Sequence, residues 1–250
     1  MACARHMYLR SGLAAAVYFA VTLTGVSVFA VDTTWTLNGN GDWNVAGNWS
    51  NGEPNGNSFN AFIDDGDSAV TVNLNVNRSI GNLSIGSNDT LRLSDTFDLS
   101  ITGPSVVNNG TISIIGGDVL NINTNIILTN PEATFSGTGT IQLGGTFQSR
   151  ILNSAVTNEL INGGTHTIAG GGQLGINSMK LTNQGTIDAN ILGAALIVDP
   201  SSSNANNTGT MRATSGGILR LQGGVFTNTG GTIRAQGVGS VVELNGAGNG

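Results

Sequence analysis

The stretch Asn183-Gln184-Gly185-Thr186-Ile187 is one copy of a short signature that recurs along the chain. Each copy places a threonine after one or two glycines, and most copies follow it with an apolar residue. The marker threonines are Thr111, Thr140, Thr165, Thr186, Thr210 and Thr232. Their spacings of 29, 25, 21, 24 and 22 residues define a unit of about 22 residues. Self-similarity at such a period is typical of solenoids.

A second apolar burst follows the signature within each unit. Clear examples are Ile218-Leu219-Arg220-Leu221 and Val241-Val242-Glu243-Leu244, which alternate apolar with polar residues as half-buried strands do. A unit of two or three short strands cannot bury its own apolar face, whereas a stack of such units can. We therefore predict an all-β fold, a right-handed parallel β-helix of seven to nine coils. A β-sandwich is the main alternative, but it does not require a self-similar signature.

The small residues of the repeat have expected roles of their own. Glycines would supply positive φ angles at the corners of each coil. The asparagine that precedes most marker threonines would stack from coil to coil and form an amide ladder like those of cross-β assemblies. The candidates for this ladder are Asn108, Asn162, Asn183 and Asn207.

The first thirty residues read as a signal peptide. Arg5 and Arg10 precede an uncharged, mostly apolar run, and Val28-Phe29-Ala30 offers small residues where a signal peptidase cuts. An uncleaved membrane anchor is the alternative, because the run is nearly long enough to span a bilayer. We expect a signal peptide at residues 1–30, a cap at 31–67 and β-helix repeats at 68–250, with no membrane span in the mature chain.

Removal of the leader leaves an acidic chain with no cysteine. All fifteen acidic residues but only seven of the nine basic ones follow Ala30, so the mature net charge is −8. Disulfides and cysteine-ligated metals are excluded. Scattered arginines on an acidic chain give no electrostatic footprint for nucleic acid. We expect no cofactor and an extracellular location, secreted or associated with the outer membrane.

Residues 31–67 differ from the repeats because they hold all three tryptophans, Trp35, Trp43 and Trp49. One interpretation is a cap, since the first coil of a solenoid exposes core and strand edges that must be covered. The alternative is a carbohydrate-binding platform, in which exposed indole faces stack on sugar rings. The cap is the preferred interpretation.

An acidic cluster, Asp64, Asp65 and Asp67, closes this segment around Gly66. Three carboxylates near a glycine can supply the oxygen ligands that calcium prefers. Their spacing is not that of an EF-hand loop, and a solvated turn is the preferred interpretation.

The N-terminal segment also resembles a known class of proteins. Asp42-Trp43, Asn48-Trp49-Ser50, Gly52-Glu53-Pro54 and Leu83-Ser84-Ile85-Gly86 look like the start of large bacterial surface proteins with autotransporter-type or PEP-CTERM-associated repeats. The later Asn-x-Gly-Thr-Ile units are similar to haemagglutinin-like passenger repeats. The resemblance implies a parallel β-helix at the cell exterior, and it transfers no catalytic residues. Such proteins end in an anchoring module, so we expect the chain, which stops at Gly250, to be truncated.

No catalytic constellation stands out in the repeats. Lys180 and Asp188 lie within one unit, but two residues do not make a lyase site, and the carboxylates are too thinly spread for a glycosidase pair. His166 has no partner at an obvious spacing and is expected on the surface of a strand. The expected function is structural or adhesive, with extracellular glycans or other surface proteins as partners. The alternative is a carbohydrate-binding or polysaccharide-degrading β-helix.

Overall fold

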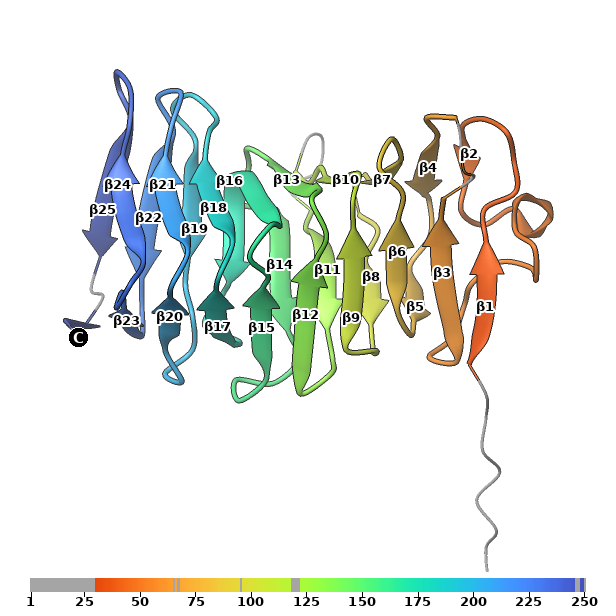
Figure 1. Cartoon of the computed structure of the whole chain (residues 1–250), viewed down its shortest axis with the longest axis horizontal. Coiled ribbons are helices and arrows are strands. Elements are labelled where there is room, and N and C mark those ends of the chain that lie inside the picture. The colour runs from red at the N-terminus through yellow and green to blue at the C-terminus, as the bar shows by residue number, and fades with distance from the viewer. Residues whose placement is uncertain are drawn as a thin grey trace, which may run out of the picture.

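The computed structural model is a parallel β-solenoid of about 8 turns, and it confirms the predicted fold class. The structure describes residues 30–64, 66, 68–94, 96–117, 122–245 and 248–249. The predicted signal peptide, except for Ala30, lies outside these residues. Successive coils stack along one axis, from β1 at one end to β25 at the other (Figure 1).

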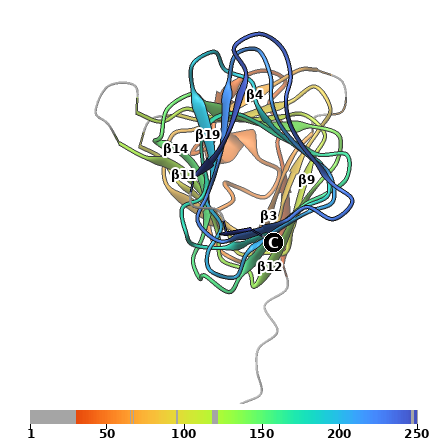
Figure 2. The ribbon, with the colours of Figure 1, turned by 90° about the vertical axis from the view of Figure 1, so that its left-hand side faces the viewer.

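Each coil contributes strands to three faces. Face 1 contains β1 (Val31–Thr34), β3 (Phe59–Ile63), β6 (Leu83–Ile85), β9 (Ser105–Asn108), β12 (Glu132–Ser136), β15 (Glu159–Asn162), β17 (Lys180–Asn183), β20 (Ala205–Asn207), β23 (Val225–Thr227) and β26 (Gly248–Asn249). Viewed along the axis, the faces enclose a single cross-section (Figure 2). All pairings between these strands are parallel, because every coil repeats the path of the one before it.

Faces 2 and 3 follow in the same order within each coil. Face 2 contains β2 (Gly41–Asp42), β4 (Thr71–Leu74), β7 (Thr90–Leu93), β10 (Thr111–Ile114), β13 (Thr140–Gly144), the first part of β16 (Thr167–Gly175), β18 (Thr186–Ala189), β21 (Thr210–Ala213) and β24 (Thr232–Ala235). Face 3 contains β5 (Arg78–Ile80), β8 (Leu99–Ile101), β11 (Thr124–Leu128), β14 (Ser149–Asn153), the second part of β16, β19 (Ala195–Val198), β22 (Ile218–Gln222) and β25 (Val241–Asn245).

One strand, β16, turns the corner between faces 2 and 3 without a loop. It pairs with β13 and β18 on face 2 and with β14 and β19 on face 3. Gly170, at φ 115°, and Gly172, at φ 152°, make the bend, because L side chains rarely adopt such angles. The glycine run that breaks the apolar alternation in the sequence is therefore a corner.

The marker threonines form one outward-facing column on face 2, which contains Thr71, Thr90, Thr111, Thr140, Thr167, Thr186, Thr210 and Thr232. The register corrects the third copy, where Thr167 and not Thr165 occupies the column. The sequence signature also missed Thr71 and Thr90, because no glycine precedes them. The next residue in every strand of the column is apolar and points into the core.

The core is one continuous cluster along the axis, built from the inward residues of the three faces. Ile112, Ile141 and Ile187 on face 2 and Leu196 and Leu219 on face 3 are fully buried members. Burial of each such side chain stabilises the fold by about 1.5–3 kcal/mol relative to exposure. Each additional coil therefore adds a similar stabilising free energy to the fold.

The glycine that precedes the marker threonine is required for a reason other than the expected one. At Gly110, Gly139, Gly185 and Gly209, φ is not positive. A Cβ at any of these positions would lie 2.2–2.3 Å from a backbone carbonyl oxygen of the preceding coil. The signature glycine permits close contact between coils, whereas positive φ angles occur at other glycines.

Candidate functional site: the tryptophan cap and the axial asparagine ladder

The three tryptophans form a buried cluster at the N-terminal end. Trp35, Trp43 and Trp49 are 1%, 0% and 4% exposed. The rings of Trp35 and Trp49 meet edge to face at 5.1 Å between centroids, and those of Trp43 and Trp49 lie 4.8 Å apart. This geometry suits the quadrupoles of the rings. The three indoles belong to the same hydrophobic cluster as the core of the coils.

Each indole N–H has a backbone acceptor, so burial leaves no indole donor unsatisfied. Trp43 Nε1 donates to Pro54 O at 3.1 Å, and Trp49 Nε1 donates to Trp43 O at 2.9 Å. Trp35 Nε1 donates to Gly39 O at 3.3 Å. The three rings are therefore packed inside the N-terminal end of the core, and the capping role of residues 31–67 stays a prediction. None of the three indoles presents an open face on which a sugar could stack, so the carbohydrate-platform interpretation of Trp35, Trp43 and Trp49 finds no support in this geometry.

The cap is also part of the first coil. β1 pairs with β3 in full register, and β2 pairs with β4. Between β2 and β3 the chain makes a short 3-10 helix, η1 (Ala46–Asn48), and a loop that carries Trp49. In the view along the axis, this N-terminal segment crosses the end of the cross-section that the faces enclose (Figure 2). Strand pairing thus begins at Val31, inside the segment predicted to be a separate cap.

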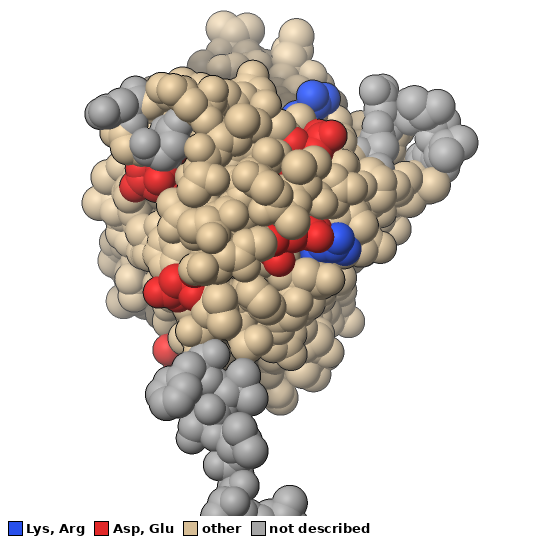
Figure 3. All heavy atoms as spheres, turned by 90° about the vertical axis from the view of Figure 1, so that its right-hand side faces the viewer, with Lys and Arg blue, Asp and Glu red and all other residues tan. Residues whose placement is uncertain are grey.

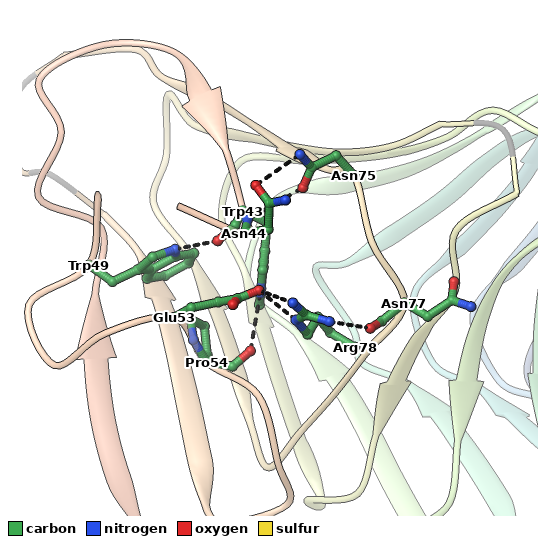
Figure 4. A network of polar contacts seen from close by, with 8 residues as sticks. All are labelled: Trp43, Asn44, Trp49, Glu53, Pro54, Asn75, Asn77 and Arg78. Carbon is green, nitrogen blue, oxygen red and sulfur yellow. Dashed lines mark hydrogen bonds and ion pairs between the residues drawn. The ribbon is translucent and has the colours of Figure 1, made fainter. Parts of the chain in front are cut away.

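An ion pair and an amide pair fasten the cap to the next coil (Figure 4). Glu53 Oε1 lies 2.5 Å from both Nε and Nη2 of Arg78, and Arg78 Nη1 also donates to a backbone carbonyl at 2.9 Å. Asn75 Nδ2 donates to Asn44 Oδ1 at 3.0 Å. The Glu53 and Arg78 side chains are only 18% and 16% exposed. A charge-assisted pair of this kind is stronger than one on an open surface.

The candidate calcium cluster lies largely outside the described residues, because Asp65 and Asp67 are not among them. Asp64 Oδ1 accepts a hydrogen bond from the Gly66 amide at 3.2 Å, a turn contact. Among the residues that the structure describes, no three metal-ligating side chains gather. Figure 3 shows the acidic side chains at this end as separate groups on a mostly uncharged surface. Calcium binding at this cluster stays a prediction.

The predicted asparagine ladder is present in the C-terminal half of the solenoid. Asn162 Nδ2 donates to Asn183 Oδ1 at 2.7 Å, Asn183 Nδ2 to Asn207 Oδ1 at 2.7 Å, and Asn207 Nδ2 to Asn228 Oδ1 at 2.6 Å. The same amides also donate to backbone carbonyls of the adjacent coils, such as Thr210 O. Asn162, Asn183 and Asn207 are at most 1% exposed. Buried amides must be hydrogen bonded, and here the side-chain amide of each coil donates to the side-chain amide of the next coil.

The ladder is interrupted at one coil, and His166 closes the gap. In that coil the register position of Asn162 is occupied by Phe135. His166 lies beside Phe135, with 5.7 Å between ring centroids. Its Nδ1 is 2.8 Å from Asn162 Oδ1, and its Nε2 is 3.2 Å from Asn108 Nδ2. Asn108 is therefore linked to the ladder through an imidazole and not by direct stacking.

The chemistry of the ladder fixes the state of the imidazole. An amide oxygen can only accept, so His166 Nδ1 carries the proton and Nε2 accepts from Asn108. Burial lowers the pKa of His166 to about 4, which keeps the ring neutral. His166 is fully buried, so the expectation of a surface histidine is wrong. The sequence did indicate the gap in the ladder, because the signature copy one unit earlier, at Gly139-Thr140, lacks the asparagine.

Charged side chains pair between neighbouring coils in the same way. Glu159 Oε2 lies 2.7 Å from Lys180 Nζ on face 1, and Arg212 Nε lies 2.8 Å from Asp188 Oδ2 on face 2. A third pair, Arg220 and Glu243 at 2.6 Å, lies on face 3. Lys180 and Asp188, which share one repeat unit, thus have different partners on different faces. The three pairs thus link successive coils on all three faces.

Comparisons with protein-family models, with curated proteins and with solved structures gave no match. No helix among the described residues is long and apolar enough to cross a bilayer. The assignment of a role therefore depends on the fold and on the contacts described above.

Proposed function

We propose that this chain is an exported bacterial cell-surface or secreted repeat protein in which the solenoid serves as a structural and adhesive rod. The observation that carries the proposal is the axial ladder. Its side chains form hydrogen bonds from each coil to the next, as a rod that resists separation of its coils requires. The ion pairs Glu159–Lys180 and Asp188–Arg212 act in the same direction. At about 4.8 Å per coil, 8 turns give a rod of about 38 Å.

Export is supported by the sequence of residues 1–30, with its positive start, apolar run and small residues before Val31. The mature chain would then be free of cysteine, which suits a fold that depends on stacking and not on disulfides. Its partners would be extracellular glycans or other surface proteins, and its location the exterior of the envelope.

The proposal is tested by expressing the full chain in a Gram-negative host and fractionating the cells. We expect N-terminal sequencing of the recovered protein to begin at Val31. We also expect the protein to be found outside the inner membrane, either accessible to protease added to intact cells or present in the medium. An uncleaved chain retained in the cytoplasm would refute export. The control is the double variant Val28→Trp with Ala30→Trp, which places bulky residues where the peptidase requires small ones and should block cleavage.

A further inference from the structure

Face 1 carries a hollow of about 270 Å³ near its N-terminal end, where β1, β3, β6 and β9 lie side by side (Figure 1). Its position on paired strands, and not on loops, gives it a fixed shape. The residues that line it are Asp32, Asn60, Phe62, Asn82, Leu83, Ser84, Ser105 and Val107.

The hollow arises from the sizes of three stacked side chains. Phe62, Ser84 and Val107 occupy the same outward register position on β3, β6 and β9. The serine between two larger residues leaves a gap, of which the half-buried Phe62 ring forms one apolar wall. No hydrogen bond to Ser84 Oγ is present within the described residues, so this hydroxyl is available to a ligand.

The neighbouring outward column is a chain of polar groups. Asn60 Nδ2 donates to Asp32 Oδ1 at 2.7 Å, Asn82 Nδ2 donates to Asn60 Oδ1 at 3.0 Å, and the Ser105 amide donates to Asn82 Oδ1 at 3.0 Å. These bonds fix the amides in place. Asp32 Oδ2 has no hydrogen bond within the described part of the chain, and a carboxylate accepts several.

We propose that this hollow binds one pyranose unit of a neutral polysaccharide. A sugar ring has a C–H face that packs on the negative face of an aromatic ring, and hydroxyls that require donors and acceptors. Phe62 meets the first need, and Asp32 and Ser84 meet the second. Asp32 is the only charged residue in the lining, so an acidic sugar would be repelled. The volume is close to the lower limit of small-ligand sites, which fits one ring.

The site deepens the proposed function, on whose adhesive role and glycan partners it rests, because it specifies the class of glycan and the place where it binds. Binding to the purified protein does not depend on export. A failed binding test would leave the rod and its export untouched, and a failed export test would leave the site untouched.

The experiment is isothermal titration of the purified protein with cellohexaose, maltohexaose and mannohexaose, with hexagalacturonate as the acidic comparison. We expect at least one neutral hexasaccharide to bind with a Kd of about 0.1–1 mM, and hexagalacturonate to bind at least about tenfold more weakly. Phe62→Ala should weaken binding by about tenfold or more. The matched control is Phe147→Ala, which removes a half-exposed phenylalanine of a distant corner loop and should change Kd less than about twofold.

A second variant guards against misfolding of Phe62→Ala. Ser84→Leu fills the hollow without removing the aromatic wall, and it should abolish binding while the thermal unfolding midpoint stays within a few degrees. The proposal is overturned if no neutral hexasaccharide binds at millimolar concentration. It is also overturned if Phe62→Ala and Phe147→Ala affect binding equally.

Discussion

His166 Nε2 lies 3.2 Å from Asn108 Nδ2, although the two residues are 58 positions apart and belong to coils separated by a third. The intervening coil places Phe135 where its neighbour on the C-terminal side places Asn162. The imidazole spans that coil and continues the line of buried hydrogen bonds. The line ends at Asn108, because the coil before it presents Ile85 at the same register. Accordingly, Asn108 Oδ1 has no partner among the described residues.

The ladder predicts that two nearby asparagines, Asn183 and Asn206, contribute very differently to the free energy of unfolding. Asn183→Ala should lower the free energy of unfolding by about 2–3 kcal/mol, because it leaves buried amide groups on both neighbouring coils unpaired. Asn206→Ala is the control, since that side chain is exposed and makes no hydrogen bond within the described residues. It should change stability by less than about 0.5 kcal/mol. Urea unfolding followed by circular dichroism measures both, and equal losses would contradict a stabilising ladder.

The buried histidine predicts a specific pH dependence. Its pKa in the folded protein is about 4, below the ordinary value of 6.5, so the unfolded chain binds more protons between these values. Stability from this group is therefore complete above pH 6.5 and is lost as the pH falls toward 4. The loss should be about 3 kcal/mol. Because carboxylates also titrate in this range, the measured quantity is the difference between the wild type and His166→Gln. Parallel pH profiles of the two proteins would rule out the mechanism.

In the cap, loss of Trp43 should lower the stability of the protein more than loss of the Glu53–Arg78 ion pair. Trp43→Ala should cost about 3–5 kcal/mol, because it removes a fully buried ring and leaves a cavity over the first coil. Glu53→Gln should cost about 1–2 kcal/mol, because the largely buried Arg78 loses its charged partner. Chemical unfolding at two salt concentrations separates the two effects, since only the ion pair should respond to salt. A negligible cost for Trp43→Ala would show that the segment does not act as a cap.

The signature glycine predicts a steric effect between coils. Gly185→Ala should lower stability by about 2–3 kcal/mol or more, because its Cβ would lie 2.2 Å from Gly163 O. Gly164→Ala is the matched control in the neighbouring coil, where a Cβ meets no atom within 4 Å and φ is not positive. That variant should change stability by less than about 1 kcal/mol. Thermal unfolding of the two variants checks the prediction, and a similar midpoint for both would refute it.

Much of the fold followed from the sequence because the repeat is a local pattern. Alternating bursts such as Ile218-Leu219-Arg220-Leu221 specify strands, and the recurring threonine specifies stacking. The ladder of Asn162, Asn183 and Asn207 was predictable for the same reason. The third threonine was assigned wrongly, because a turn that contains Thr165 shifts the strand by two residues without disturbing the spacing noticeably.

The candidate sites were less predictable. The three tryptophans were identified from composition, but composition does not distinguish a buried ring from an exposed one. The hollow beside Phe62 depends on the residues that lie above and below it in other coils, at positions about 22 residues away along the chain. Such neighbours become visible only when the register is known.

The sequence by itself determined that this chain is an all-β solenoid with about 22 residues to the coil, because apolar alternation and small turn residues act locally. Only the tertiary structure decided which side chains meet. Register between coils depends on the corner lengths, and a change of one residue moves every outward side chain inward. That is why the link from Asn108 through His166 to Asn162 could not be predicted from the sequence, although both asparagines could be predicted as members of the ladder.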